Sequence, residues 1–144
     1  VTAGVGASPR AMTFVGFWVD ASNCSVSVLR SDRKCLFYVS AAGSFTNVAE
    51  VAGPSLSDVS DGQFWLRNTR TTDGTFVAWW GVGVSGALPT TWRRIGVRTD
   101  AALAAALPTA ASIVVLTGAY GEGAIGSAWT VDVLAIRTTS AGSL

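Results

Sequence analysis

Apolar and polar residues alternate along much of the chain, and this period of two predicts β-strands. Cys24–Leu29 (CSVSVL) shows the strictest alternation. Ser25 and Ser27 fall on one side of such a strand, and Val26 and Val28 fall on the other. A strand with one polar and one apolar side is typical of a sheet that faces a core on one side and water on the other. We therefore expect a half-buried strand here.

The segment Phe64–Gly86 carries the clearest turn signal. Asp73-Gly74 lies between two apolar, β-branched runs, and glycine accepts the positive φ that a tight hairpin turn requires. The first run begins with the aromatic residues Phe64 and Trp65, and the second run is Thr75–Val84. Together they hold three of the six tryptophans of the chain. This pattern predicts a hairpin at the centre of the core.

Further strands follow from the remaining apolar runs. They are expected at Ala11–Val19, Cys35–Val39, Phe45–Val51, Thr91–Thr99, Ser112–Thr117 and Trp129–Thr138. In Thr91–Thr99 the alternation puts Trp92 and Arg94 on one face and Arg93, Ile95 and Val97 on the other. Between strands, we expect a polar loop at Pro54–Gly62 and a glycine loop at Gly118–Ser127. The single helix predicted is Ala101–Leu107, capped by Asp100 and stopped by Pro108.

About eight to ten short strands with frequent turns and at most one short helix are typical of an all-β fold. We expect an antiparallel β-sandwich, jelly-roll-like in its strand order. The 144 residues suit one domain. We place an N-terminal arm or linker at residues 1–10, the sandwich at residues 11–138 and a C-terminal tail or linker at residues 139–144.

Composition removes several classes of function. Apolar residues make up 49% and charged residues 13%, the net charge is +1, and there is no histidine. Without histidine no Ser-His-Asp triad exists, and the commonest metal ligand is missing. A net charge near zero argues against a nucleic-acid partner. The apolar stretch Ala101–Tyr120 is interrupted by Pro108, so it is not a membrane span. We expect no catalytic site, no cofactor and no metal.

Three weaker motifs have simpler structural explanations. The glycines of Gly81–Gly86 match a dinucleotide-binding pattern, but no helix follows, so we interpret them as letting a strand bend past bulky indoles. Asp58 and Asp61 share a loop and would offer calcium oxygen ligands, although aspartate in a turn usually accepts backbone hydrogen bonds. The arginines at 93 and 94 are adjacent in a strand, so they point to opposite faces and form no single basic stripe.

The two cysteines, Cys24 and Cys35, lie eleven positions apart. We expect a disulfide, which would close a loop of about 12 residues and stabilise the fold by roughly 3 kcal/mol. The alternative is a pair of reduced, buried thiols. A turn centred on residues 31 and 32 would place Cys24 opposite Val39, so the bridge requires the turn to lie nearer residues 29 and 30, or a bulge.

Asn23-Cys24-Ser25 matches the acceptor pattern for N-glycosylation, which makes Asn23 the glycosylation candidate. The pattern agrees with an extracellular location, as does a disulfide. The chain opens without a basic start and an apolar run, so any signal peptide would already have been removed.

The chain contains six tryptophans, an unusually large number for its length, and most of them suit core packing. Trp79 and Trp80 are adjacent in a predicted strand, so they must point to opposite faces. If one is in the core, the other faces outward or into a second layer, and an outward indole suits stacking on a sugar or anchoring of a neighbouring subunit. We take Trp79, Trp80 and Trp92 as the candidate residues for ligand or partner contact.

The layout resembles the farnesoic acid O-methyltransferase-like domain, which also occurs in natterin-type proteins. The similar residues run in order through roughly residues 12 to 131: Phe14-x-x-Phe17-Trp18-Val19, Asp20-Ala21, Tyr38-Val39, Gly43, Phe64-Trp65-Leu66, Asp73-Gly74-x-Phe76, Gly81-x-Gly83, Trp92, Val114-Val115-x-Thr117-Gly118 and Trp129. The sequence departs from the family in its middle, at YVSAAGSFTNVAEVAG. The resemblance implies a β-sandwich of secreted or surface proteins that is associated with binding or adhesion, and no family binding residue carries over.

We expect a non-catalytic extracellular or surface module for recognition or adhesion, with a glycan as its partner. The alternative is a structural subunit of an extracellular filament or matrix, assembled with copies of itself through its termini and exposed aromatic residues. A minor alternative is the methyl transfer that the family name implies. A typical methyltransferase holds its cofactor on an α/β sheet with a glycine loop before a helix, and this sequence predicts neither.

Overall fold

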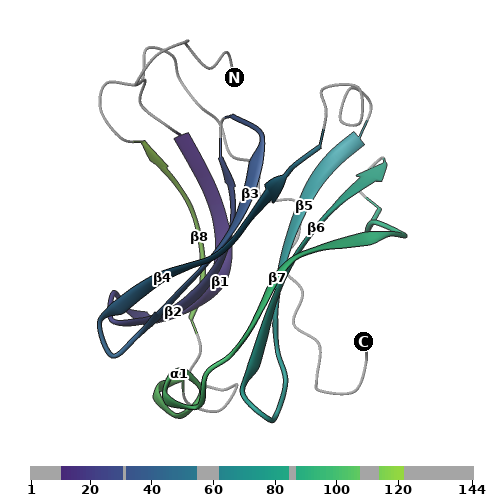
Figure 1. The fold of residues 1–144 in the computed structure, drawn as a ribbon. Helices are drawn as coiled ribbons and strands as arrows, with labels where there is room; N and C mark the ends of the chain where they lie inside the picture. The colour runs from purple at the N-terminus through teal and green to yellow at the C-terminus, as the bar shows by residue number, and fades with distance from the viewer. Residues whose placement is uncertain (1–10, 31, 55–61, 85–86, 108–113, 122–144) are drawn as a thin grey trace.

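Two antiparallel sheets packed face to face form the described part of the chain (Figure 1). The computed structural model describes residues 11–30, 32–54, 62–84, 87–107 and 114–121. The five-stranded sheet has the order β4 (Ser44–Ala52), β3 (Lys34–Ala41), β2 (Asn23–Arg30), β1 (Ala11–Asp20) and β8 (Val114–Gly121). The three-stranded sheet has the order β5 (Gly62–Arg70), β6 (Thr75–Val84) and β7 (Trp92–Thr99). One short helix, α1 (Ala101–Ala106), lies at the lower end of the sandwich in Figure 1.

The predicted antiparallel sandwich with one short helix is confirmed. Strands that follow one another in the chain lie side by side within each sheet, as in a meander, and β8 is added next to β1. This order lacks the interleaving of strands that two Greek keys give to a jelly roll. The predicted glycine loop is wrong at its start, because Gly118–Gly121 continue β8, with Gly118 opposite Phe14 of β1. The strand expected at Trp129–Thr138 lies outside the described residues, as do both terminal segments.

The core lies between the sheets and is lined by alternate residues of β3 and β6. Its buried members are Cys35, Phe37, Val39, Phe76, Ala78, Trp80, Ile95, Leu103 and Leu107. Phe17 of β1 meets Phe76 edge to face across the sandwich, with ring centroids 6.5 Å apart. Burial of the apolar surface of these side chains away from water stabilises the folded state. The core therefore joins both sheets and the helix in one cluster.

Helix α1 closes one end of this core, and the predicted cap is confirmed. The carboxylate of Asp100 accepts a hydrogen bond of 3.0 Å from the backbone N–H of Leu103. The guanidinium of Arg70 in β5 donates to the carbonyl oxygens of Ala104 and Leu107 at 2.9 Å. Both ends of a six-residue helix are thus satisfied by side chains. This holds the helix against the three-stranded sheet.

Strand β2 presents its polar side to the interior, which the alternation alone did not indicate. Ser25 donates a hydrogen bond of 3.1 Å to the side chain of Asn68 in β5, and Ser27 donates to the carbonyl of Arg67 at 3.0 Å. Val26 and Val28 face the other way and pack with Leu36 in a second apolar cluster. Both sides of β2 are buried, so the predicted half-buried strand is wrong. Its serines instead link the two sheets.

The central hairpin forms at the predicted turn. Gly74 has φ of 81°, and its N–H donates to the carbonyl of Thr71 at 3.1 Å. The turn pairs Arg67 of β5 with Trp79 of β6. On the other side of β6, a bulge between Ala78 and Trp79 shifts the register with β7. Val97 therefore faces outward with 47% of its surface exposed, which corrects the prediction that it shares a face with Ile95.

Gly16→Ala should destabilise the fold strongly, because a Cβ at this position would overlap the backbone carbonyl of Ser25 and lie 2.8 Å from the Cα of Val26. Strands β1 and β2 would have to separate, and we expect a loss of at least about 2 kcal/mol in the free energy of unfolding. Urea denaturation measures it. Gly43→Ala is the comparison, since its Cβ would make only an ordinary contact of 3.8 Å with the hydroxyl oxygen of Ser22. The strain there comes from the φ of 80° alone and should cost about 1–2 kcal/mol. Equal stability of Gly16→Ala and the wild type would contradict the register of β1 with β2.

Candidate functional site

The outward side of the three-stranded sheet carries the site that the structure assembles from predicted residues. Cross-strand pairing places Arg67, Trp79 and Arg94 side by side on β5, β6 and β7. Thr69 and Trp92 flank this row on the same side. We call the set Arg67, Thr69, Trp79, Trp92 and Arg94 the outer tryptophan face. Since directly opposite residues of an antiparallel pair share a side, these five side chains point away from the core.

Trp79 is the centre of the outer tryptophan face. Its ring is half-buried, and its indole N–H donates to the hydroxyl of Thr69 at 3.3 Å. Arg67 and Arg94 lie opposite Trp79 on the two neighbouring strands. The hydrogen bond orients the indole, and an arginine stands opposite Trp79 on each neighbouring strand. This arrangement confirms the prediction that one of the two adjacent tryptophans faces outward.

Trp80 points the other way and belongs to the core. It is 4% exposed and stacks on Phe64, with ring centroids 6.1 Å apart. The guanidinium of Arg93 covers the ring at 5.0 Å from its centroid. The expectation that Trp80 contacts a ligand or partner is therefore wrong. Adjacent strand residues cannot share a face, and the core takes Trp80.

Trp92 lies beside Trp79 and is held by a basic side chain. The guanidinium of Arg67 lies 5.4 Å from the centre of the Trp92 ring, at the distance of a cation–π contact. Trp92 is opposite Gly81, so Arg67 of β5 crosses the middle strand to reach a ring on β7. The structure thus brings two of the three predicted contact residues together.

A loop segment borders the outer tryptophan face at one end. A Cβ on Gly81 would lie 2.7 Å from the Cβ of Pro89, and one on Gly83 would lie 2.7 Å from the indole nitrogen of Trp65. The two glycines therefore make room for Pro89 and for the Trp65 ring, so the expected indole lies beside Gly83, whereas Gly81 accommodates a proline. Trp65 is 9% exposed, and its indole nitrogen has no hydrogen-bond partner among the described residues.

Sequence reasoning did not single out Arg67 and Arg94 as partners of Trp79. The signal for Arg67 was present, since a hairpin centred on Asp73 pairs position 67 with position 79. The position of Arg94 depends on the bulge in the pairing of β6 with β7, for which no turn residue gives a sign. Arg93 and Arg94 do point to opposite sides, as expected.

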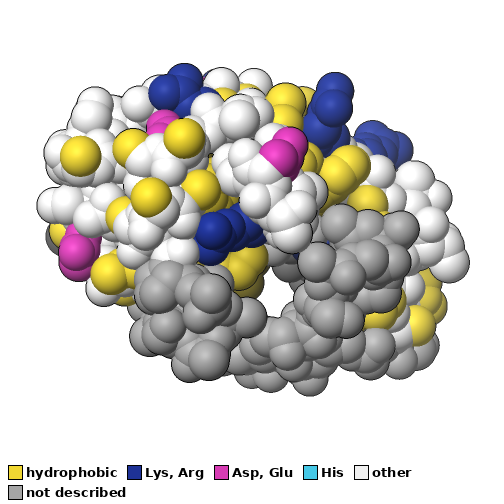
Figure 2. Space-filling model, turned by 90° about the horizontal axis from the view of Figure 1, so that it is seen from below, with side chains coloured by type: hydrophobic (Ala, Val, Ile, Leu, Met, Phe, Trp, Pro, Cys, Tyr) yellow, Lys and Arg dark blue, Asp and Glu magenta, His cyan; other side chains and the backbone are white. Residues whose placement is uncertain are grey.

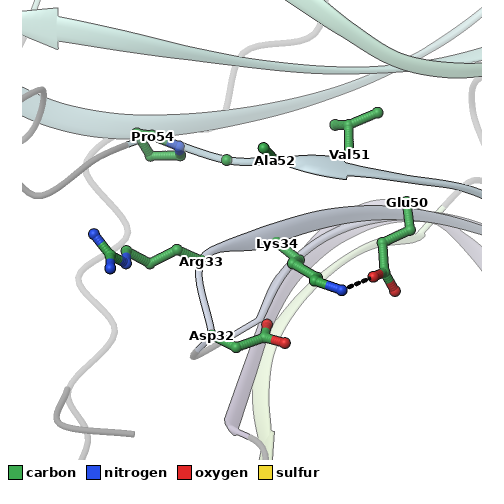
Figure 3. Close-up of a pocket in the computed structure, with 8 residues that line it drawn as sticks. Asp32, Arg33, Lys34, Glu50, Val51, Ala52 and Pro54 are labelled. Atoms are coloured by element: carbon green, nitrogen blue, oxygen red, sulfur yellow. Dashed lines mark hydrogen bonds and ion pairs between the residues drawn. The ribbon is translucent and has the colours of Figure 1, made fainter.

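A second, shallow pocket opens at the β2–β3 turn and the end of β4 (Figure 3). It is lined by Asp32, Arg33, Lys34, Glu50, Val51, Ala52, Gly53 and Pro54. Lys34 and Glu50 pair with each other, while Arg33 points away from them (Figure 3). The buried guanidinium of Arg30 binds Asp32 at 2.7 Å and Glu50 at 3.3 Å. The opposite charges neutralise one another, so the pocket serves to hold the turn against β4.

These ion pairs lower the pKa values of the carboxyl groups of Asp32 and Glu50. The hydrogen bonds from Arg30 lower the pKa of Asp32, and the hydrogen bond from Lys34 lowers the pKa of Glu50. A carboxyl whose folded pKa lies below its unfolded value stabilises the fold while ionised. That stabilisation is complete above the ordinary values of 3.8 and 4.5 and is lost as the pH falls through the lowered folded values.

The described residues give little support for a metal site, a membrane span or an extended charged surface. They contain no group of three or more side chains with metal-binding chemistry, and none of their helices is long and apolar enough to cross a membrane. Asp58 and Asp61, considered for calcium, lie outside them. Seen from below, the basic and acidic side chains are scattered among hydrophobic and uncharged ones (Figure 2). No large patch of one sign is visible among the described side chains on that side.

The cysteines do not form the expected disulfide, and the prediction is corrected. Cys24 lies opposite Ser40 and Cys35 lies opposite Leu29, so the two are at opposite ends of the β2–β3 hairpin. They also point to opposite sides of the sheet, with Cys35 in the core. Both are free and buried thiols. The reduced, buried pair, which was the alternative, is what the register allows.

Asn23, the glycosylation candidate, takes part in the β1–β2 turn. Its side-chain amide donates to Asp20 at 3.2 Å, and its side-chain oxygen accepts from the backbone N–H of Ala42 at 3.2 Å. The hydroxyl of Ser25, the third residue of the acceptor pattern, is buried against Asn68. Attachment of a glycan to Asn23 stays a prediction, and in the folded chain it would displace these two hydrogen bonds.

Comparison of the chain with protein-family models, with curated proteins and with solved structures found no match. The resemblance to the farnesoic acid O-methyltransferase-like domain therefore stays a prediction.

Asp32→Asn should lower the free energy of unfolding at neutral pH by about 1 kcal/mol, because it removes one carboxylate from the buried Arg30. The difference from the wild type should shrink as the pH falls below 3.8 and through the lowered pKa of folded Asp32, because the carboxyl of the wild type then also becomes protonated. Urea denaturation at several pH values measures this. Arg33→Gln is the control, since the Arg33 side chain has no ion pair or hydrogen bond within the described residues. A difference that does not change with pH would contradict the assigned ion pair.

Both thiols should react slowly with a thiol-specific reagent in the native protein. Burial raises the pKa of Cys24 and raises that of Cys35 to about 12, so little thiolate forms at neutral pH. In denaturant without any reductant, two thiols per chain should react at once. Ellman's reagent measures both states. A protein that shows no thiol after unfolding would restore the disulfide.

Proposed function

We propose that the chain is a non-catalytic module of an extracellular or surface protein, and that it binds glycans through its outer tryptophan face. The observation that carries this proposal is the outward position of Trp79, with its indole N–H engaged by Thr69 at 3.3 Å. A ring held in this way offers its flat surface to a ligand. Aromatic surface of this kind, with a polar handle, is what stacking on an apolar sugar face requires.

The neighbours of Trp79 add the polar part of such a site. Thr69 brings a hydroxyl to the indole, and Arg67 and Arg94 on the neighbouring strands add guanidinium groups, which hydrogen-bond readily to hydroxyl and acidic oxygens. The sheet beneath is rigid, because β6 is paired on both sides. A site on paired strands loses little conformational entropy when it binds.

Catalysis receives no such support from the described residues. In the pocket at the β2–β3 turn both acids are neutralised, Asp32 by Arg30 and Glu50 by Lys34 and Arg30, and both buried cysteine thiols have raised pKa values. An active site would instead gather perturbed, unpaired groups in a concave pocket. We therefore favour binding over enzymatic activity.

Assembly of copies into a filament or matrix is the second candidate. Phe45 of β4 is 63% exposed and stacks on Tyr38 with ring centroids 4.9 Å apart, on the outward side of the five-stranded sheet. An exposed aromatic pair next to the apolar cluster of Val26, Val28 and Leu36 is the kind of surface that packs against a neighbouring subunit.

Trp79→Ala should weaken binding to a polysaccharide array at least about tenfold, since loss of one stacking contact costs about 1.4 kcal/mol. The array carries both neutral and acidic polysaccharides. Trp79→Phe keeps a ring at the same place and should retain part of the binding. Thermal unfolding checks that each variant is folded.

Trp18→Ala is the matched control, because Trp18 is also a half-buried strand tryptophan but lies opposite Cys24 on the five-stranded sheet. It should bind as the wild type does. If the wild-type protein binds no polysaccharide on the array, the proposal is refuted. A protein that elutes as a large assembly and binds no polysaccharide would favour the filament candidate.

A further inference from the structure

We propose that the outer tryptophan face selects sugars that carry carboxylate or sulfate groups, a specificity that rests on the glycan binding proposed above. In this arrangement Trp79 lies under a sugar ring, and Arg67 and Arg94 on either side bind its anionic groups. The inference follows from charge, from spacing and from the way the two guanidinium groups are held.

The charge of this face is not balanced by any acid in the described residues. Arg94 is exposed and makes no ion pair or hydrogen bond there, and Arg67 contacts the ring of Trp92 and no carboxylate. The described acids are committed elsewhere: Asp20, Asp32 and Asp73 in turns, Glu50 with Arg30 and Lys34, and Asp100 at the cap of α1. Two positive charges therefore remain unpaired beside Trp79.

Apart from Arg33 at the β2–β3 turn, the other arginines of the described chain have structural partners, which sets Arg94 apart from them. Arg30 pairs with two acids, Arg70 caps the end of α1, and Arg98 pairs with Asp100 at 3.5 Å. Arg93 covers the ring of Trp80. No such contact accounts for Arg94, and an exposed cation on a face that carries no described acid is suited to an anionic partner.

The spacing matches an oligosaccharide. Arg67 and Arg94 are separated by two strand spacings, so their backbones lie about 10 Å apart with Trp79 midway. That separation between the two backbones is comparable to one disaccharide unit, so the two arginines can contact different sugars of a chain that also lies on the indole. Guanidinium groups bind carboxylate and sulfate through two parallel hydrogen bonds. The contact with Trp92 restrains Arg67 before any ligand arrives.

Single-stranded nucleic acid is the competing anionic partner, since it also combines stacking with phosphate contacts. It normally requires a track of cations along several nucleotides, and this face has two. The net charge of the chain is +1. We therefore favour an acidic glycan, and nucleic acid becomes an outcome of the test.

The test compares polymers that share a backbone and differ in charge. Polygalacturonate is paired with highly methyl-esterified pectin, and chondroitin sulfate with desulfated chondroitin, which separates carboxylate from sulfate recognition. Titration of the full chain should show at least about tenfold tighter binding to one or both charged polymers, and the advantage should fall as salt screens the charges. Arg94→Gln should remove most of this preference, because it weakens binding to the charged polymer much more than binding to the neutral one.

Arg33→Gln is the matched control, because it removes the same charge from an exposed arginine at the β2–β3 turn, away from this face. It should keep the preference. Equal binding of charged and neutral polymers, lost only in Trp79→Ala, would overturn this inference and leave the proposed glycan binding intact. Binding to no polysaccharide would overturn both. Tighter binding of an oligothymidylate than of every acidic polymer would overturn the inference in favour of nucleic acid.

Discussion

Strand β6 determines how this sandwich divides its aromatic residues, because a paired strand must send adjacent side chains to opposite sides. With a neighbour on each edge, β6 cannot rotate to bury both Trp79 and Trp80. Trp80 joins Phe64 in the core, and Trp79 faces outward between two arginines. The stability of the core and the chemistry of the outer face thus come from two consecutive residues of one strand.

Polar contacts then determine how the two sheets are placed relative to each other. Apolar packing alone tolerates sliding of one sheet over the other, whereas a buried hydroxyl loses its hydrogen bond if its partner moves. Ser25 and Ser27 reach Asn68 and the backbone of Arg67 across the interface. Arg67 therefore makes contacts on both sides of its sheet. Its backbone carbonyl accepts the hydrogen bond from Ser27 on the inner side, and its guanidinium contacts Trp92 on the outer side.

Local signals predicted most of the architecture. The Asp73-Gly74 turn and the alternation on either side of it were sufficient for the central hairpin and for the opposite orientations of Trp79 and Trp80. Asp100 likewise marked the start of α1. These features depend on residues that are neighbours in the chain, so the sequence alone specifies them.

Features that depend on distant residues were not predictable in this way. Alternation in β2 separates serines from valines but does not say which side meets the second sheet, and here Asn68 of β5 decides it. The outward turn of Val97 arises from a bulge, and the hairpin register decides that Cys24 and Cys35 cannot meet. For the site, Trp79 and Trp92 were accessible to reasoning, while the placing of Arg94 beside Trp79 required the pairing of β6 with β7.

The close packing of Pro89 on Gly81 has a consequence for how the sequence of this protein could vary in evolution. A glycine at that position lets a connecting segment rest directly on the sheet, next to Trp92, without disturbing the strands beneath. Changes in that segment on either side of its proline anchor would raise or lower one rim of the surface while the tryptophan and arginine row stayed in place. Related chains could in this way vary the shape of this surface without rebuilding their scaffold.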